Sequence, residues 1–147
     1  MQITRQADYA VRAVLYLAQQ QPGQRVSTAE VGREQKIPVS FLAKIVAQLA
    51  AAGVLHTTRG AHGGLWLARP AEMLSVLEVV EAIDGPLALN ACVLDPAACE
   101  LSDDCAVRAV WCEAQADLAR RLAQATFGQL TRQPRHAAGS LAVAAAL

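Results

Sequence analysis

Residues 27–67 decide the fold and read STAEVGREQKIPVSFLAKIVAQLAAAGVLHTTRGAHGGLWL. Ser27 followed three residues later by Glu30 has the capping-box arrangement of a helix start. Lys36-Ile37-Pro38 forms a short turn, and a second helix is predicted from Val39 to about Ala52. We expect the inward face of this second helix to be its apolar positions at helical spacing: Phe41, Leu42, Ile45, Val46 and Leu49. Two short helices joined by a tight turn are a helix-turn-helix candidate.

A glycine-rich hairpin is predicted directly after the second helix. Residues 54–58 and 65–67 have the composition of two short strands, and the intervening RGAHGG, residues 59–64, has that of a turn. Three glycines at the tip favour close approach of the backbone to another molecule, and Arg59 adds a positive charge there. A purely structural hairpin is the alternative. With the preceding helices, the hairpin predicts a winged helix-turn-helix domain over residues 1–70.

The remaining elements are predicted from caps and periodicity. Thr4 caps a first helix to about Gln20, Ser75 caps a helix that ends near Asp84, and residues 87–101 are expected to form a loop. Ser102 is expected to cap a long helix from Asp103 to about Ala125. The predicted fold class is therefore mainly α with a small β-hairpin wing, with a cysteine loop and dimerisation helix over residues 71–130. Residues 131–147 form an alanine-rich tail that we expect to be flexible.

The long helix carries an apolar stripe that a small domain cannot cover by itself. Its positions recur every three or four residues: Val107, Val110, Trp111, Ala114, Leu118, Leu122 and Ala125. A two-fold partner would bury them and would match palindromic DNA, so the sequence predicts a homodimer. An internal core helix of a monomer is the alternative.

Charge is distributed unevenly although the formal net charge is zero. Residues 1–70 carry eight Lys and Arg against three Asp and Glu, and residues 71–147 carry five against ten. A basic half favours DNA through counterion release, although ordinary surface scatter would also produce this split. The N-terminus does not have a signal-peptide pattern and no apolar run reaches the length of a membrane span. We expect a cytoplasmic protein with no membrane partner.

Four cysteines lie in the C-terminal half, and the first three are the candidate metal ligands. Cys92, Cys99 and Cys105 are separated by six and then five residues, whereas zinc sites usually pair their ligands as C-x₂₋₄-C. In a reducing cytoplasm thiols serve as ligands or redox groups, and soft thiolates suit an iron–sulphur cluster. Zinc and a metal-free thiol switch stay open. Cys112, two helical turns after Cys105, is expected to pack as a small apolar side chain in the dimer interface.

In order and spacing, the sequence resembles the Rrf2 family of winged-helix transcription regulators from Met1 to about Leu130. The resemblance rests on MQITRQADYAVRA at residues 1–13, RGAHGGLWLARP at 59–70, SVLEVVEAIDGP at 75–86, and the three-cysteine loop before a long helix. The spacing of the cysteines resembles the cluster-binding loop of the iron–sulphur members of the IscR and NsrR types. The resemblance implies a dimer on a palindromic operator, controlled by a [4Fe-4S] or [2Fe-2S] cluster that senses nitric oxide, oxygen and redox state, or iron–sulphur status.

The resemblance also bears on the fourth cluster ligand. In IscR-like members a histidine three residues after the last cysteine is the fourth ligand. Here Arg108 occupies that position, and its guanidinium cannot coordinate a metal. NsrR-like members use an acidic residue early in the first helix of the partner subunit, and Asp8 matches that position. The alternative role of Asp8 is to stabilise the first helix through a favourable interaction with the positive end of the helix dipole.

Candidate DNA contacts come from the second helix of the motif, the wing and the first helix. Ser40 can donate to a phosphate or base edge, and Lys44 can neutralise a phosphate. Arg59 can enter a minor groove, with three tip residues allowing close backbone approach: Gly60, Gly63 and Gly64. For three further residues, phosphate contact and solvated surface are both open: His62, Arg5 and Arg12. Ala43 replaces an acidic base-reading residue of some IscR-like members, so their operator sequence does not carry over.

The sequence does not indicate an enzyme. It has no Gly-rich phosphate loop and no clustered His and acid pair, and its three histidines are scattered. The competing interpretations are therefore a zinc-stabilised repressor, a metal-free thiol-redox repressor, and an interaction protein that does not bind DNA.

Overall fold

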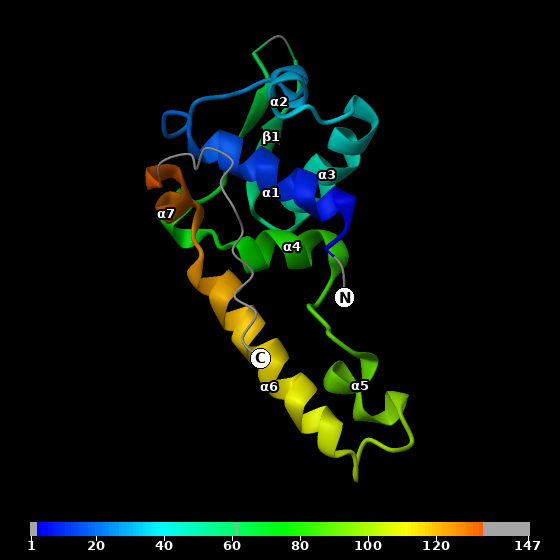
Figure 1. Cartoon of the computed structure of the whole chain (residues 1–147). Coiled ribbons are helices and arrows are strands. Elements are labelled where there is room, and N and C mark those ends of the chain that lie inside the picture. The colour runs from blue at the N-terminus through cyan, green and yellow to red at the C-terminus, as the bar shows by residue number, and fades with distance from the viewer. Residues whose placement is uncertain (1–2, 61, 134–147) are drawn as a thin grey trace.

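The computed structural model describes residues 3–60 and 62–133. A head, comprising the elements before α5 together with α7, carries the DNA-reading candidates, and α6 extends from it with α5 beside its far end (Figure 1). The elements in chain order are α1 (Arg5–Ala18), α2 (Thr28–Gln35), α3 (Val39–Ala51), β1 (Leu55–Thr58), β2 (Gly64–Leu67), η1 (Ala71–Met73), α4 (Val76–Asp84), α5 (Ala91–Leu94), η2 (Pro96–Ala98), α6 (Ala106–Gln124) and α7 (Phe127–Arg132).

Helix α1 lies at the centre of the head. Thr4 caps it as predicted, because its side chain accepts from the Ala7 N–H at 3.1 Å. Asp84 at the end of α4 fixes this same turn by accepting from the Thr4 hydroxyl at 2.6 Å and the Thr4 N–H at 3.1 Å. The apolar face of α1 then packs on a core to which both helices of the motif, the wing, α4 and α7 all contribute.

The helix-turn-helix is formed by α2 and α3, with two departures from expectation. Ser27 caps α2 through the Glu30 N–H, but the Glu30 carboxylate accepts from the Tyr16 hydroxyl at 3.0 Å, so the capping box is only half formed. Phe41 was expected to face inward, and this is wrong: it is 38% exposed and packs edge-on against the Tyr9 ring. The buried face of α3 is narrower than predicted and consists of Leu42, Ile45 and Leu49.

The wing is a two-stranded antiparallel hairpin. Its register pairs Leu55 with Leu67 and Thr58 with Gly64. An isolated bridge between Val26 and Leu65 ties its second strand to the segment before α2, with backbone bonds of 2.8 and 3.0 Å. The wing is therefore held to the helix-turn-helix by main-chain bonds.

Helices α4 and α7 close the head. Ser75 and Glu78 form a complete capping box at the start of α4, and Thr126 and Gln129 form another at α7. The Phe127 N–H donates to the Leu74 carbonyl at 2.9 Å, and the Phe127 side chain is fully buried in the core. The chain thus leaves the head after α4 and returns to it at α7.

The start of the long helix differs from prediction. Helix α6 begins at Ala106 with Cys105 as its N-cap, so Ser102 is not the cap and Asp103 and Asp104 precede the helix. Residues 101–104 form turns instead, in which the Asp104 N–H donates to the Leu101 carbonyl at 3.3 Å. The expected plain loop over residues 87–101 is also wrong, because it contains the short helices α5 and η2.

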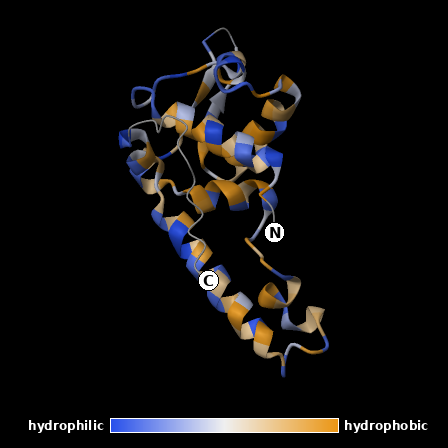
Figure 2. Ribbon diagram, in the orientation of Figure 1, coloured by the Kyte–Doolittle hydropathy of each residue, from blue (hydrophilic) through white to orange (hydrophobic). Residues whose placement is uncertain are grey.

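None of the 19 residues of α6 is buried against the rest of the described chain. Val107 is 53% exposed, Val110 59% and Trp111 40%. Apolar and polar residues alternate along this helix, whereas α4 of the head carries a broader apolar surface (Figure 2). Among the described residues, no helix combines the length and apolarity that crossing a bilayer requires.

Candidate nucleic-acid interface and cysteine segment

The second helix of the motif presents its first turn to solvent. Ser40 and Lys44 are both exposed, and neighbouring Val39 is 70% exposed. Pro38 precedes the helix and makes no side-chain cap hydrogen bond to its first turn. Ser40 and Lys44 lie one turn apart and share a face, which suits a helix that enters a groove by its N-terminus.

At the wing tip, Arg59 and His62 are exposed. Gly60 has φ +107°, which L side chains rarely adopt, and a Cβ on Gly63 would collide with the Thr58 carbonyl oxygen. Gly64 lies against the backbone of Val26, where a Cβ would come within 2.9 Å of the carbonyl oxygen. The fold of the wing itself therefore requires glycine at these positions, and the role of these glycines in DNA approach stays a prediction.

Arg25 is a wing-associated cation that sequence reasoning missed. Its guanidinium lies 5.0 Å from the centroid of the Trp66 ring, and its Nη1 donates to the His62 carbonyl at 3.2 Å. An arginine held by stacking and by a main-chain bond is pre-organised, so it would lose less entropy than a free arginine on binding an anion. The residues around Arg25 do not predict this contact, because Arg25 meets Trp66 only when the wing folds back onto the segment before Ser27.

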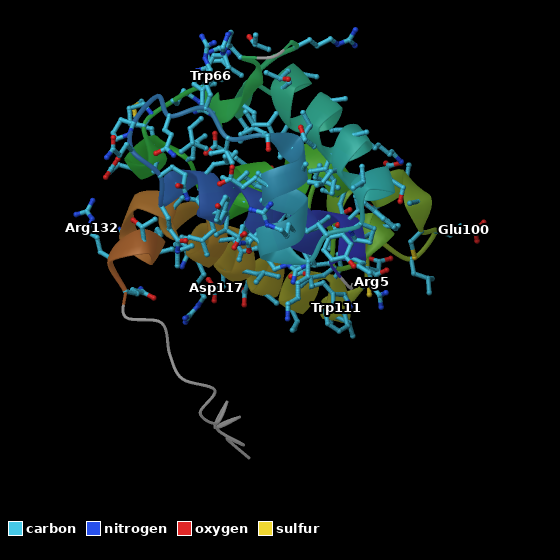
Figure 3. The ribbon with its side chains drawn as sticks, turned by 90° about the horizontal axis from the view of Figure 1, so that it is seen from above. Arg5, Trp66, Glu100, Trp111, Asp117 and Arg132 are labelled. Atoms are coloured by element: carbon cyan, nitrogen blue, oxygen red, sulfur yellow. The ribbon has the colours of Figure 1, made fainter. Side chains whose placement is uncertain are left out.

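The first-helix candidates have distinct surroundings. Arg12 pairs with Asp8 one turn earlier, with Nε 3.5 Å from Oδ2, and its guanidinium lies 4.9 Å from the Tyr9 ring centroid. Asp8 keeps 60% of its side-chain surface exposed. Arg5 is exposed and lies on a different side of the head from Trp66 of the wing (Figure 3). Contacts of Arg5 and Arg12 with DNA stay predictions.

We call residues 92–105 the cysteine segment. Cys92 lies on α5, Cys99 directly follows η2, and Cys105 caps α6; all carry free thiols, and that of Cys99 is exposed. In the described residues, no three Cys, His, Asp or Glu side chains are grouped closely enough to hold a metal ion. The donor chemistry fits an iron–sulphur cluster, since three soft thiols occupy one short segment, but the segment must tighten to bring them together.

Two contacts organise this segment. The Arg108 Nε donates to the Cys92 carbonyl at 3.0 Å, which holds α5 against the start of α6. Arg108 therefore has a structural role here, tying the start of α6 to α5. Ser102 is only 5% exposed, and its hydroxyl has no hydrogen-bond partner among the described residues.

Cys112 is half-buried on α6, outside the cysteine segment. Its burial in a dimer interface stays a prediction, as does ligation by Asp8, which belongs to the head and which would have to come from a second subunit.

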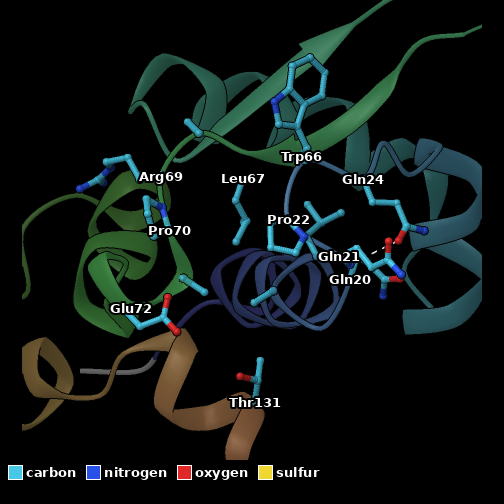
Figure 4. A pocket seen from close by; sticks show the side chains of 15 residues that line it. Gln20, Gln21, Pro22, Gln24, Trp66, Leu67, Arg69, Pro70, Glu72 and Thr131 are labelled. Atoms are coloured by element: carbon cyan, nitrogen blue, oxygen red, sulfur yellow. Dashed lines mark hydrogen bonds between the residues drawn. The ribbon is translucent and has the colours of Figure 1, made fainter.

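A hollow of about 510 Å³ lies apart from the cysteine segment, between the end of α1, the second strand of the wing, η1 and α7 (Figure 4). Two charged residues line the hollow, and both form ion pairs with residues outside its lining. Arg69 pairs with Glu78 at 2.9 Å, and Glu72 pairs with Arg132 at 3.0 Å. With these charges satisfied, the hollow indicates no ligand of particular chemistry.

Comparison with known proteins connects these features. The sequence matches the family model Rrf2, described as an iron-dependent transcriptional regulator, over residues 3–133. It is 33% identical to protein rrf2 of Nitratidesulfovibrio vulgaris over 132 residues, which cover 90% of this chain and 88% of that protein.

Solved structures share the architecture. CymR, the global cysteine regulator of B. subtilis, aligns with a TM-score of 0.73 at 19% identity, covering 89% of this chain and 96% of that one. IscR of T. potens aligns with a TM-score of 0.72 at 22% identity, covering 95% and 94%. These likenesses confirm the predicted fold class, a mainly helical winged helix-turn-helix with a hairpin wing.

Proposed function

The chain belongs to the Rrf2 family of DNA-binding transcription regulators, and from this premise we propose that an iron–sulphur cluster on its cysteine segment controls its binding to a palindromic operator. Its relatives and its fold are those of transcription regulators rather than enzymes. The cluster, the homodimer and the residues that contact DNA are the parts of this proposal that go beyond the family.

One observation carries the cluster proposal: three thiols lie within residues 92–105, at the point where the exposed helix α6 begins. The proposed ligands are Cys92, Cys99 and Cys105, with the partner subunit's Asp8 in the fourth place. A carboxylate is a weak iron ligand among thiolates, so this corner would be open to nitric oxide or oxygen. When bound, the cluster would supply a redox- and ligand-sensitive iron centre, either [4Fe-4S] or [2Fe-2S].

The uncovered face of α6 supports a homodimer. Val107, Val110 and Trp111 remain 40–59% exposed in the single chain, on the helix that carries the Cys105 cap. Pairing of two such helices would bury these side chains and place the two heads about a two-fold axis. The heads would then contact two half-sites of double-stranded DNA.

Within each head we propose that the first turn of α3 reads the major groove and the wing reads the minor groove. Ser40 and Lys44 would contact a base edge or phosphates, and Arg59 would enter the minor groove from the exposed wing tip. Arg25, held beside the wing by the Trp66 ring and the His62 carbonyl, would add a phosphate contact.

Control of DNA binding follows from where the ligands lie. Ordering the cysteine segment fixes the start of α6, and Asp8 would connect that segment to α1 of the other subunit's head. Occupancy of the operator changes only if the cluster is bound more tightly in one arrangement of the heads than in the other. The signal would be nitric oxide, oxygen and redox state, or iron–sulphur supply.

The test is purification without oxygen, followed by iron and sulphide analysis, absorption spectroscopy and native mass spectrometry. We expect a coloured dimer, a colourless dimer for Cys99→Ala, and an unchanged cluster for the matched control Cys112→Ala. Wild-type protein without iron or sulphide that also resists reconstitution would contradict the cluster. Normal iron content in Cys99→Ala would contradict the ligand assignment.

A second candidate is a thiol-based repressor, either zinc-bound or metal-free. It is favoured by the exposed Cys99 thiol and by the wide separation of the three thiols in the described chain. The same metal analysis separates zinc from iron. Reversible disulfide formation under mild oxidant, in protein without metal, would support the metal-free form.

A further inference from the structure

The buried hydroxyl of Ser102 has no partner, although it lies between two of the proposed ligands. In the described residues two polar side chains are buried, Ser75 at 8% exposure and Ser102 at 5%. The Ser75 hydroxyl lies 3.0 Å from the Glu78 carboxylate and accepts from the Glu78 N–H. The Ser102 hydroxyl makes no such bond.

An unsatisfied buried hydroxyl is unfavourable because it has lost its hydrogen bonds to water, and native proteins seldom retain one without a partner. The surroundings of Ser102 make its burial unusual, since residues 94–101 are all exposed and Leu101 next to it is 73% exposed. The main chain also holds Ser102 in the cysteine segment, because its N–H donates to the Cys99 carbonyl at 3.1 Å.

Resting on the function proposed above, we propose that the Ser102 hydroxyl donates a hydrogen bond to a sulphur atom of the cluster, either a ligand thiolate or an inorganic sulphide. Ser102 is three residues from both Cys99 and Cys105, so the two cysteines flank the turns in which it lies. Tightening of the segment around a cluster would bring sulphur acceptors to this hydroxyl. We assign Ser102 as a donor because a neutral hydroxyl donates a hydrogen bond. To replace the carboxylate of the partner subunit's Asp8 as an iron ligand, it would have to lose its proton.

This bond makes Ser102 a positioning residue that tunes the centre. Hydrogen bonds to cluster sulphurs are one of the determinants of reduction potential, because they stabilise the more negative, reduced state. Removing the donor should therefore make the cluster harder to reduce while leaving its iron and sulphide content unchanged.

The experiment compares Ser102→Ala with wild type and with Ser102→Thr, which keeps the hydroxyl. Each is reconstituted without oxygen and titrated with dithionite in the presence of redox mediators, and iron–sulphur stretching bands are recorded by resonance Raman. For Ser102→Ala we expect about a tenfold fall in the one-electron reduction constant, about 59 mV, with shifted bands. Ser102→Thr should remain close to wild type.

The possible failures are distinguishable. Wild-type protein that takes up no iron or sulphide contradicts the proposed function itself. If wild type holds a cluster and Ser102→Ala has the same potential and the same bands, the hydrogen bond is refuted while the function stands. Folded, dimeric Ser102→Ala that takes up no iron, beside a loaded Ser102→Thr, would make Ser102 a ligand and also overturn the donor assignment.

Discussion

Truncation of Trp111 should weaken the dimer because this side chain is the largest exposed apolar group on α6. Trp111 is 40% exposed in the single chain. For a side chain of about 250 Å², that fraction is about 100 Å², or about 2.5 kcal/mol when fully covered. A two-fold interface contains the residue twice, so Trp111→Ala should weaken dimerisation by up to about 5 kcal/mol, which is three to four powers of ten in the dissociation constant.

Sedimentation velocity over a dilution series measures this dissociation constant directly. Glu113→Ala, at an exposed position on the same helix, is the matched control and should stay dimeric. Circular dichroism establishes that the head of Trp111→Ala remains folded. Equal dissociation constants for Trp111→Ala, Glu113→Ala and wild type would refute burial of this face between subunits.

Three further predictions concern the head. Arg59→Ala should weaken specific operator binding by about 1–3 kcal/mol at fixed salt, measured by fluorescence anisotropy, whereas unchanged affinity would remove the wing contact. Phe127→Ala should lower the free energy of unfolding by about 3–5 kcal/mol in urea titration, since the side chain is 0% exposed; a loss no larger than that of Phe41→Ala, at a 38% exposed position, would contradict anchoring by α7. Burial alone would raise the pKa of Glu78, but bonds from the Ser75 N–H and from Arg69 lower it below the usual 4.5. The Glu78 contribution to stability is therefore full above that value and is lost as the pH falls through the lowered pKa, so the melting temperature of Glu78→Gln should vary less with acidification. Parallel profiles for Glu78→Gln and wild type would count against this.

Local signals predicted the head well because its elements are set by nearby residues. Thr4, Ser27 and Ser75 all cap helices as expected, since each cap depends on residues within four positions of one another. The wing was predicted to within one residue for the same reason, because the composition of its turn and of its two strands lies within residues 54–67.

The misplaced features depend on contacts between distant residues. Glu30 was predicted to complete its own capping box, but its carboxylate instead accepts a hydrogen bond from the hydroxyl of Tyr16 on another helix. Ser102 followed by two aspartates has the pattern of a helix start, yet its side chain is buried in the turns before α6. The tie between Arg25 and Trp66 likewise has no local sequence signal.

The candidate site was predictable only in part. The cysteines and the candidate DNA contacts could be identified from residue type and spacing, and the structure leaves Ser40, Lys44 and Arg59 exposed. The sequence does not predict which groups come together in space, because the cluster ligands are proposed to come from two subunits. The bond from Arg108 to the Cys92 carbonyl depends on the packing of α5 against α6, and the unpartnered hydroxyl of Ser102 depends on the fold of the turns before α6.

The most direct test of cluster control is the operator affinity of one preparation before and after its cluster is removed, at constant ionic strength and without oxygen. The account predicts affinities that differ by at least tenfold for wild type, and no difference for Cys99→Ala taken through the same treatment. Identical affinities for loaded and cluster-free wild type would contradict it.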